Sequence, residues 1–218
     1  MVRILLLCMG YCFGLFQTGY IYGRLHGIDI RSKGSGNSGA TNSLRVLGKK
    51  AGLIVFLGDA LKCHIPAAFT VLYFSHVQPD HTYLYMMYMA LGTILGHNFP
   101  FYMGFKGGKG ISCMGGLVAA YDWRFMLFCF VEVFGLIAIT RYVSVASLVL
   151  SVTMFLFSVI MGSTGNLGLA EEILPEFYIV CFVLSALAIW QHRGNIKRLM
   201  NGTENKIGKK QEKVPAQK

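Results

Sequence analysis

A short polar segment near the N-terminus carries the groups that bind phosphate in proteins. It runs from Gly34 to Arg45, reads GSGNSGATNSLR, and separates two long apolar stretches. Its glycines leave backbone N–H groups open to an anion, and its hydroxyl, amide and guanidinium groups add further donors. A plain flexible linker would not need the polar side chains that alternate with these glycines, among them Asn37, Thr41 and Asn42. We therefore interpret the segment as an anion-binding loop.

A second glycine-rich loop, Gly104–Gly110, reads GFKGGKG and offers the same chemistry. Lys106 and Lys109 add positive charge, and the amides from Gly107 to Gly110 would open the apolar segment that follows, where a helix N-terminus attracts anions. Ordinary lysines beside a membrane are the alternative, but they do not require four glycines among seven residues. We interpret this loop as a second phosphate-binding element.

Neither loop has the pattern of a nucleotide site. Gly34–Gly39 matches G-x-G-x-x-G, but no strand precedes it and an apolar segment soon follows, so a dinucleotide site is excluded. The second loop is not a Walker A loop. Met103 stands where the first glycine belongs, and Gly110 stands where Ser or Thr would hold Mg²⁺.

Three further candidates lie at the ends of later apolar segments. Ser144 begins one segment, where it either donates to an anion or caps the helix. His192 and Asn195 follow the last segment three residues apart, so they share a face if that helix continues. An ordinary basic stretch leaving the membrane is the alternative, and its alternation of basic and apolar residues also permits an interfacial amphipathic helix.

Among the ionisable residues within the apolar segments, four are considered for chemistry. Asp59 and Lys62 stand three apart on one helix face, and we favour a structural ion pair over a catalytic one. His97 precedes the second loop and is either a ligand or base or a residue that satisfies a neighbouring helix. Glu132 has no local partner, and we assign it no role.

The segments that must position these groups are those of an integral membrane protein. Of the 218 residues, 54% are hydrophobic and 14% charged, against about 25% charged in soluble domains; the mean hydropathy is +0.53. The pattern predicts an all-α, polytopic fold with seven transmembrane helices and cytoplasmic glycine-rich loops, from apolar segments at 3–23, 51–75, 82–103, 108–121, 124–140, 143–162 and 174–191.

The fourth segment is short, which predicts a half-helix or a tilted helix that starts inside the protein. The first segment is expected to be a retained helix rather than a cleaved signal peptide, because no cleavage site stands at a convincing place. We expect one membrane-embedded domain over residues 1–205 and a basic cytoplasmic tail over residues 206–218.

The basic residues set the orientation. With seven crossings, 17 of the 20 lysines and arginines fall on the side of the glycine loops and the C-terminus, and Arg3, Lys62 and Arg124 are the exceptions. The positive-inside rule makes that side the cytoplasm and places the N-terminus outside. The formal charge of +10 is thereby explained without nucleic acid. The six cysteines have neither CxxC nor zinc spacing, so we expect no metal site and no disulfide.

Five motifs in order resemble the bacterial PlsY family of acyl-phosphate:glycerol-3-phosphate acyltransferases. They are SGNSGATNSLR, GDALK, GHNFPFYMGFKGGKG, RYVSVAS and HRGNIKRLMNGTEN. The resemblance covers nearly the whole chain and implies seven membrane helices, an outside N-terminus and a cytoplasm-facing site in the bacterial inner membrane. The chain departs from the family at Ile111–Cys113, where Val-Ala-Thr is more usual.

The resemblance implies transfer of an acyl group from acyl phosphate to the sn-1 hydroxyl of glycerol 3-phosphate, giving lysophosphatidic acid and inorganic phosphate without a cofactor. By motif position, glycerol 3-phosphate is expected at Ser35, Arg45, Lys106, Ser144, His192 and Asn195. Acyl phosphate is expected at the backbone amides near Thr41 and Asn42 and at the turn of Gly107, Gly108, Lys109 and Gly110, with Asn37 as a further substrate-binding residue. Glu204 is expected to brace the last cytoplasmic segment.

We expect His192, Asn195 and Lys106 to be the catalytic groups. The glycerol hydroxyl must lose a proton, and His192 is the best nearby base. The departing phosphate or the bound substrate can take the proton instead, and we favour this substrate assistance. The expected partners are glycerol 3-phosphate, acyl phosphate and membrane lipid, with no obligatory protein partner.

Other functional classes fit less well. A His-x4-Asp acyltransferase is excluded because no histidine of the chain has an aspartate five positions later. A transporter of phosphorylated compounds predicts polar groups on both sides of the bilayer, whereas the predicted outside loops are acidic and poor in motifs. A membrane anchor without chemistry would have no use for so many small polar residues in the loops.

Overall fold

The computed structural model describes residues 1–208, and they form helices joined by short turns and loops. Four of the connections contain 3₁₀ turns: η1 (Ile30–Ser32), η2 (Pro79–His81), η3 (Phe101–Met103) and η4 (Glu171–Ile173). The α-helices are α1 (Val2–Gly14), α2 (Thr18–Leu25), α3 (Ala40–Leu47), α4 (Lys49–Val77), α5 (Thr82–Asn98), α6 (Ile111–Tyr121), α7 (Trp123–Thr140), α8 (Val143–Ser163), α9 (Leu174–Gln191) and α10 (Arg193–Met200).

Each predicted apolar segment contains a helix, and α7, α8 and α9 match their predicted bounds to within one residue. Five stretches are long and apolar enough to cross a membrane by length and composition: Val2–Leu25, Lys49–Val77, Trp123–Thr140, Val143–Ser163 and Glu171–Gln191. With 17 and 11 residues, α5 and α6 are shorter. The fold is thus that of an all-helical membrane protein, and the number of crossings stays a prediction.

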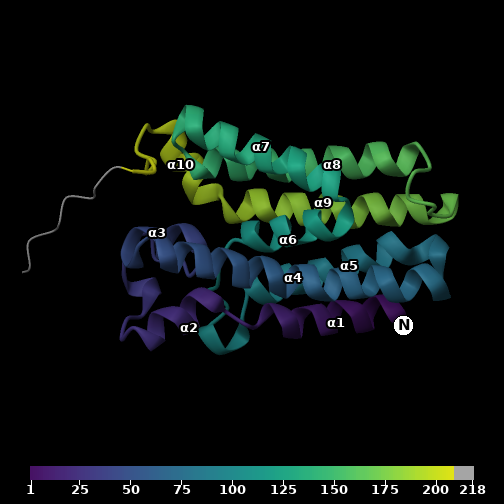
Figure 1. Ribbon diagram of the computed structural model, residues 1–218, viewed down its shortest axis with the longest axis horizontal. Helices are drawn as coiled ribbons and strands as arrows, with labels where there is room; N and C mark the ends of the chain where they lie inside the picture. Colours follow the sequence, from purple (N-terminus) through teal and green to yellow (C-terminus); the bar gives the residue numbers. More distant parts are fainter. Residues whose placement is uncertain (209–218) are drawn as a thin grey trace, which may run out of the picture.

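The long helices lie in two groups with α6 between them (Figure 1). One group holds α1, α4 and α5, which pack on one another, and the other holds α7, α8 and α9. Because α6 packs against α4, α5 and α7, it joins the groups. The short helices α3 and α10 lie at the same end of the molecule. This arrangement gathers the polar loops at one end of an apolar bundle.

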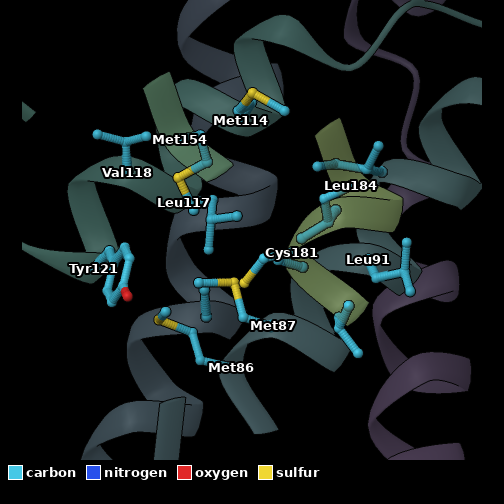
Figure 2. Packing of buried hydrophobic residues seen from close by; sticks show 14 of the residues in the cluster. Met86, Met87, Leu91, Met114, Leu117, Val118, Tyr121, Met154, Cys181 and Leu184 are labelled. Atoms are coloured by element: carbon cyan, nitrogen blue, oxygen red, sulfur yellow. The ribbon is translucent and has the colours of Figure 1, made fainter. Parts of the chain in front are cut away.

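Buried methionine and leucine side chains fill the space around α6 (Figure 2). Met87 of α5, Leu117 of α6, Met154 of α8 and Leu184 of α9 all belong to one core cluster. Methionine is unbranched and adapts to irregular gaps, which suits the junction of several helices. The cluster therefore holds both groups of helices against the short α6.

Glycines allow α1 and α5 to approach closely. A Cβ added at Gly10 would lie 2.2 Å from the carbonyl oxygen of Met89, and one added at Gly92 would lie 2.1 Å from that of Leu7. Gly14 and Gly96 repeat this arrangement one turn along each helix, where neighbouring backbones again leave no room for a Cβ. Small residues four apart are typical of helix pairs that pack by backbone contact inside membranes.

The prediction of one helix over residues 3–23 is wrong, because the chain breaks between α1 and α2. Lys62 of α4 accounts for the break. Its Nζ donates to the carbonyl oxygens of Phe16 at 2.6 Å and Gly14 at 3.3 Å, and it lies 3.0 Å from Oδ1 of Asp59. Carbonyls freed from a helix inside a membrane need such a donor. The Asp59–Lys62 pair is therefore structural, as we favoured.

The chain remains attached to the bundle beyond α10. The backbone N–H of Ile207 donates to the carbonyl oxygen of Arg141 at 2.8 Å, and the Lys206 ammonium lies 5.3 Å from the ring centroid of Tyr142. Most of the basic tail predicted over residues 206–218 lies outside the described residues, which end at Gly208.

Candidate active site

A cleft of about 460 Å³ lies where the two glycine loops meet the junction of α9 and α10. Of the predicted site residues, seven line it: Ser35, Asn37, Lys106, Gly107, Gly108, Lys109 and Asn195. Sequence reasoning had not assigned the other lining residues, which are Gly36, Asn98, Phe99, Phe105, Trp190, Gln191, Arg193, Gly194 and Arg198. The predicted residues Thr41, Asn42, Arg45, Gly110, Ser144 and His192 fall outside this lining.

Asn42 shapes the first loop from within. Its Nδ2 donates to the carbonyl oxygens of Ile30, Lys33 and Asn37 at 2.8–3.1 Å, and its Oδ1 accepts from the backbone N–H of Ser35 at 2.8 Å. Both Nδ2 protons are thereby used, so the side chain has no donor left for a phosphate. Asn42 therefore holds the loop in shape and presents Ser35 to the cleft.

The end of the first loop is helical, which the sequence did not predict. The helix α3 begins at Ala40, and the backbone N–H groups of Asn42 and Ser43 both donate to the carbonyl oxygen of Gly39 at 3.1 Å. The Asn42 amide expected to bind phosphate is thus already used. The Thr41 amide makes no backbone hydrogen bond within the described residues, so it remains available as a donor.

The glycines of the second loop serve close packing. The N–H of Gly107 donates to the carbonyl oxygen of Asn98 at 3.0 Å, and that of Gly108 donates to the carbonyl oxygen of His97 at 3.0 Å. A Cβ at Gly108 would lie 1.9 Å from His97 Nε2. The expectation that these two amides bind phosphate is therefore corrected, because both already have acceptors.

His97 supports this loop from below. Its Nδ1 lies 2.8 Å from Lys62 Nζ, and an ammonium only donates, so Nδ1 is the acceptor and the ring proton sits on Nε2, beneath Gly108. The side chain is 3% exposed. Of the two roles left open for His97, the structure shows the supporting one. Asn37 adds a tie between the loops, because its Nδ2 donates to the carbonyl oxygen of Gly107 at 3.3 Å.

Glu204 organises the cationic side of the cleft. Its carboxylate accepts from Ser144 Oγ at 3.2 Å, Asn195 Nδ2 at 2.8 Å and Arg198 Nε at 2.7 Å. Asn195 in turn accepts a hydrogen bond from Lys109 Nζ at its Oδ1. Ser144 does not cap α8, whose N-cap is Tyr142. The carboxylate thus orients side chains from two helices, α8 and α10.

Two cations of this network are partly withdrawn from water. Burial, assisted by the nearby charges of Arg198 and Arg45, lowers the pKa of Lys109 to about 8, against the opposing effect of Glu204. Burial also lowers the pKa of Arg45, which Glu204 partly offsets. Lys106 is exposed at the cleft. With Arg193 and Arg198 also in the lining, the cleft concentrates positive charge and suits phosphorylated ligands.

His192 lies behind the cleft wall, at the junction of α9 and α10. Its Nδ1 lies 2.8 Å from the carbonyl oxygen of Ala188. A carbonyl only accepts, so Nδ1 carries the proton and Nε2 has the free lone pair. Burial lowers the pKa of His192 to about 4, so the ring is neutral at physiological pH.

The backbone N–H of Ile196 donates to the carbonyl oxygen of His192 at 2.9 Å, so the helix continues nearly unbroken and Asn195 shares the face of His192, as predicted.

Metal binding has no support from the part of the chain that the structure describes. Within residues 1–208, no three His, Cys, Asp or Glu side chains gather as a metal ion would need. The independence from metal expected from the sequence stays a prediction.

Comparisons with known proteins agree with the fold and the motifs. The family described as glycerol-3-phosphate acyltransferase matches residues 4–202. A glycerol-3-phosphate acyltransferase of Clostridioides difficile is 38% identical over 96% of this chain and 97% of its own length, and one of Aquifex aeolicus is 37% identical over 95% and 100%. The crystal structure of PlsY, an integral membrane glycerol 3-phosphate acyltransferase, in its glycerol 3-phosphate form is 36% identical with a TM-score of 0.81, over 95% of this chain and 96% of that one.

Proposed function

The chain belongs to the glycerol-3-phosphate acyltransferase family, and from this premise we propose that it uses an acyl phosphate as its donor. The acyl group passes to the sn-1 hydroxyl of glycerol 3-phosphate, and the products are lysophosphatidic acid and inorganic phosphate. The observation that carries the proposal is the cleft between the two glycine loops, where Lys106, Lys109, Arg193 and Arg198 face a common space. Two phosphorylated reactants need that concentration of donors, whereas a thioester donor would bring no phosphate to the reacting carbon.

The chemistry asked of the protein is mainly alignment. The hydroxyl oxygen attacks the carbonyl carbon, the bond from that carbon to the phosphate oxygen breaks, and the phosphate leaves with the electron pair. Because an acyl phosphate is an activated mixed anhydride, positioning contributes much of the rate, roughly 7–11 kcal/mol at its greatest. Donors aimed at the leaving phosphate each contribute about 3–4 kcal/mol in comparable sites.

The hydroxyl proton passes to the departing phosphate. His192 has its lone pair on Nε2, but with a pKa of about 4 it is a weak base, and its side chain is only 3% exposed. Efficient general bases have a pKa near the working pH. A phosphate dianion is the stronger base and is already at the reacting centre. His192 then serves to orient the wall that carries Asn195.

We propose that the bundle lies in the bacterial inner membrane with its cleft at the cytoplasmic side and its N-terminus outside. Seven crossings follow if α5 and α6 span together with the five long stretches. Phe99, Phe105 and Trp190 give the cleft an apolar side, which suits the acyl chain of a donor held in the bilayer. Arg193 stacks its guanidinium 4.0 Å from the Trp190 ring centroid and marks the boundary with water.

An assay of donor use tests the proposal. Protein purified in detergent is expected to release phosphate from palmitoyl phosphate only when glycerol 3-phosphate is present, and EDTA is expected to leave the rate unchanged. Lys106→Met is the control for activity that depends on the site. We expect its kcat to fall about 100-fold, because one charged donor is lost. Equal activity with acyl-CoA and none with acyl phosphate would overturn the donor assignment.

The alkaline limb of the pH profile should belong to Lys109. Because its pKa is lowered to about 8, the ammonium is present below that pH and lost above it, so kcat/KM for glycerol 3-phosphate should fall above about pH 8. The limb in kcat/KM reports the free enzyme. Lys109→Arg keeps its charge throughout and should move the limb upward by at least about one pH unit. A wild-type profile that stays flat well above pH 8, or the same limb in both proteins, contradicts this assignment.

A further inference from the structure

The break between α1 and α2 holds a buried glutamine that does not serve its own helix. Gln17 stands at the N-cap of α2 and is 1% exposed. An N-cap side chain usually accepts a hydrogen bond from the first turn of its helix, but within the described chain the Gln17 carboxamide makes no such bond. Gln17 also lies outside the residues that line the cleft. Its role must therefore be sought in its contacts with other segments.

One end of the carboxamide is held by backbone oxygens, two of them at the end of α5. Its Nε2 donates to the carbonyl oxygens of His97 at 3.0 Å, Gly14 at 3.1 Å and Gly96 at 3.3 Å. Carbonyls only accept, so this end is the nitrogen, and its two protons are shared among them. The His97 carbonyl oxygen also accepts from the N–H of Gly108 in the second loop at 3.0 Å. Gln17 and the second loop thus meet at one backbone oxygen.

The other end of the carboxamide contacts the first loop. Its Oε1 accepts from Ser38 Oγ at 3.4 Å, and Ser38 is 2% exposed. The backbones are in contact at the same point, because a Cβ added at Gly19 of α2 would lie 1.8 Å from the carbonyl oxygen of Ser38. Gln17 therefore lies between the first loop and the residue on which the second loop rests.

This position allows Gln17 to set the separation of the two loops. The first loop lines the cleft with Ser35 and Asn37, and the second lines it with Lys106–Lys109. At the cleft the loops are tied by the bond from Asn37 Nδ2 to the carbonyl oxygen of Gly107, at 3.3 Å. Gln17 adds a second tie in the buried interior. Two ties at different points keep the loops from pivoting about either one.

We propose that Gln17 is a positioning residue that fixes the separation of the two glycine loops and thereby aligns the two phosphorylated reactants. This inference rests on the proposed function, because it needs both reactants in one cleft. Without Gln17 each loop keeps its own donors, so each reactant should still bind. The reactants would be held in a poorer geometry, and a displacement of about 1 Å at a reacting site costs on the order of 100-fold. The loss should therefore fall on kcat and leave KM nearly unchanged.

The test compares Gln17→Met with the wild type, with palmitoyl phosphate as donor. Methionine has a similar length but no amide. The variant should fold, because the carbonyl oxygen of His97 keeps its donor at Gly108 and that of Gly14 keeps one at α4. Rates are divided by the number of sites that bind glycerol 3-phosphate in calorimetry, so that unfolded protein does not count. We expect this site-normalised kcat to fall at least about 10-fold, with each KM changed less than about 3-fold. An unchanged site-normalised kcat would overturn the inference.

Thr18→Val is the matched control. Thr18 is the next residue along the chain, and its Oγ1 donates to Oδ1 of Asp59 in α4 at 3.0 Å. The control thus loses a polar contact at the same break and leaves Gln17 in place. Its site-normalised kcat should stay within about 3-fold of the wild type. An equal fall in Gln17→Met and Thr18→Val would overturn the inference and assign the effect to the break as a whole.

Ser38→Ala tests the contact from the side of the first loop. It removes the hydroxyl that donates to Gln17 Oε1 and should lower the site-normalised kcat about 3-fold, because the lost bond is long. Added to Gln17→Met, it should cause no further loss, since the two residues act through one contact. A double variant whose loss is the product of the two single losses would overturn the inference. If Gln17→Met does not fold, Ser38→Ala serves alone, and an unchanged kcat in it would overturn the inference.

Failure of the proposed function would be seen separately, as no acyl transfer from palmitoyl phosphate to glycerol 3-phosphate by wild-type protein. The separation of the loops is then measured directly, between spin labels at Lys33 and Phe101, two exposed residues that precede the two loops. The two exposed cysteines are first replaced by serine. We expect a broader or shifted distribution of distances in Gln17→Met than in the wild type or Thr18→Val. The same distribution in all three proteins would overturn the inference.

Discussion

Glu204→Gln is expected to lower kcat/KM at least about 100-fold while it preserves the size of the side chain. The carboxylate accepts from Ser144, Asn195 and Arg198 at once. Removing one partner of a buried ion pair costs roughly 3–5 kcal/mol, and we expect the lower end here because the Arg198 side chain is 40% exposed. At about 1.4 kcal/mol per factor of ten, 3 kcal/mol corresponds to the predicted loss.

The loss should appear in activity because the network positions cleft residues. Without the carboxylate charge, Lys109 and Arg198 repel each other unopposed. The glutamine amide also offers one acceptor oxygen and one donor nitrogen to a place where three donors converge. Steady-state kinetics and thermal unfolding should be measured together with Glu132→Gln. The Glu132 carboxylate accepts from Thr153 Oγ1 at 2.7 Å between α7 and α8, away from the cleft, so this control should keep its activity. Comparable losses of activity in Glu204→Gln and Glu132→Gln would show that Glu204 does not position the cleft residues.

Gly108→Ala is expected to cost about 100-fold in activity through a single methyl group. The added Cβ would stand 1.9 Å from His97 Nε2, and the ring has nowhere to move because its other nitrogen is held by Lys62 Nζ. The loop must move instead, and a displacement of about 1 Å in a reacting site costs on the order of 100-fold. Overpacking should also lower stability by about 1–3 kcal/mol.

Gly115→Ala in α6 is the control for a methyl group added to a glycine. No heavy atom of a neighbour lies within 4 Å of a Cβ built there. That variant should remain active and be as stable as the wild type or slightly more so, because alanine favours helices. Activity at saturating donor and the midpoint of denaturation, measured for both variants, distinguish Gly108→Ala from Gly115→Ala. Full activity in Gly108→Ala would show that the loop tolerates the displacement.

The sequence predicted helices well where apolar residues run without interruption, as in α7, α8 and α9. It missed the break after α1, because that break depends on Lys62, which meets the carbonyl oxygen of Phe16 from 46 residues away. It missed α3 because a loop rich in glycine and serine masked a helix of only eight residues. Long-range partners and short helices leave little trace in the local pattern.

The site was predicted in outline and corrected in detail. The motifs brought both glycine loops, Asn195 and the lysines to one cleft, as expected. The glycines themselves were assigned to phosphate, whereas Gly107 and Gly108 serve contact with α5. Composition cannot distinguish these roles, because both require a residue without a Cβ.

The short α6 sets the depth at which the reactants meet. It turns directly into α7 after Tyr121, and the two helices pack side by side, with 11 residues in α6 and 18 in α7. At about 1.5 Å per residue, the start of α6 is therefore recessed by roughly 10 Å from the end of α7. A lipid-borne donor that is drawn out of the bilayer loses about 0.8 kcal/mol for each methylene exposed to water. In the proposed reaction, the recess would avoid that loss, because the small water-soluble acceptor would move to the depth of the donor.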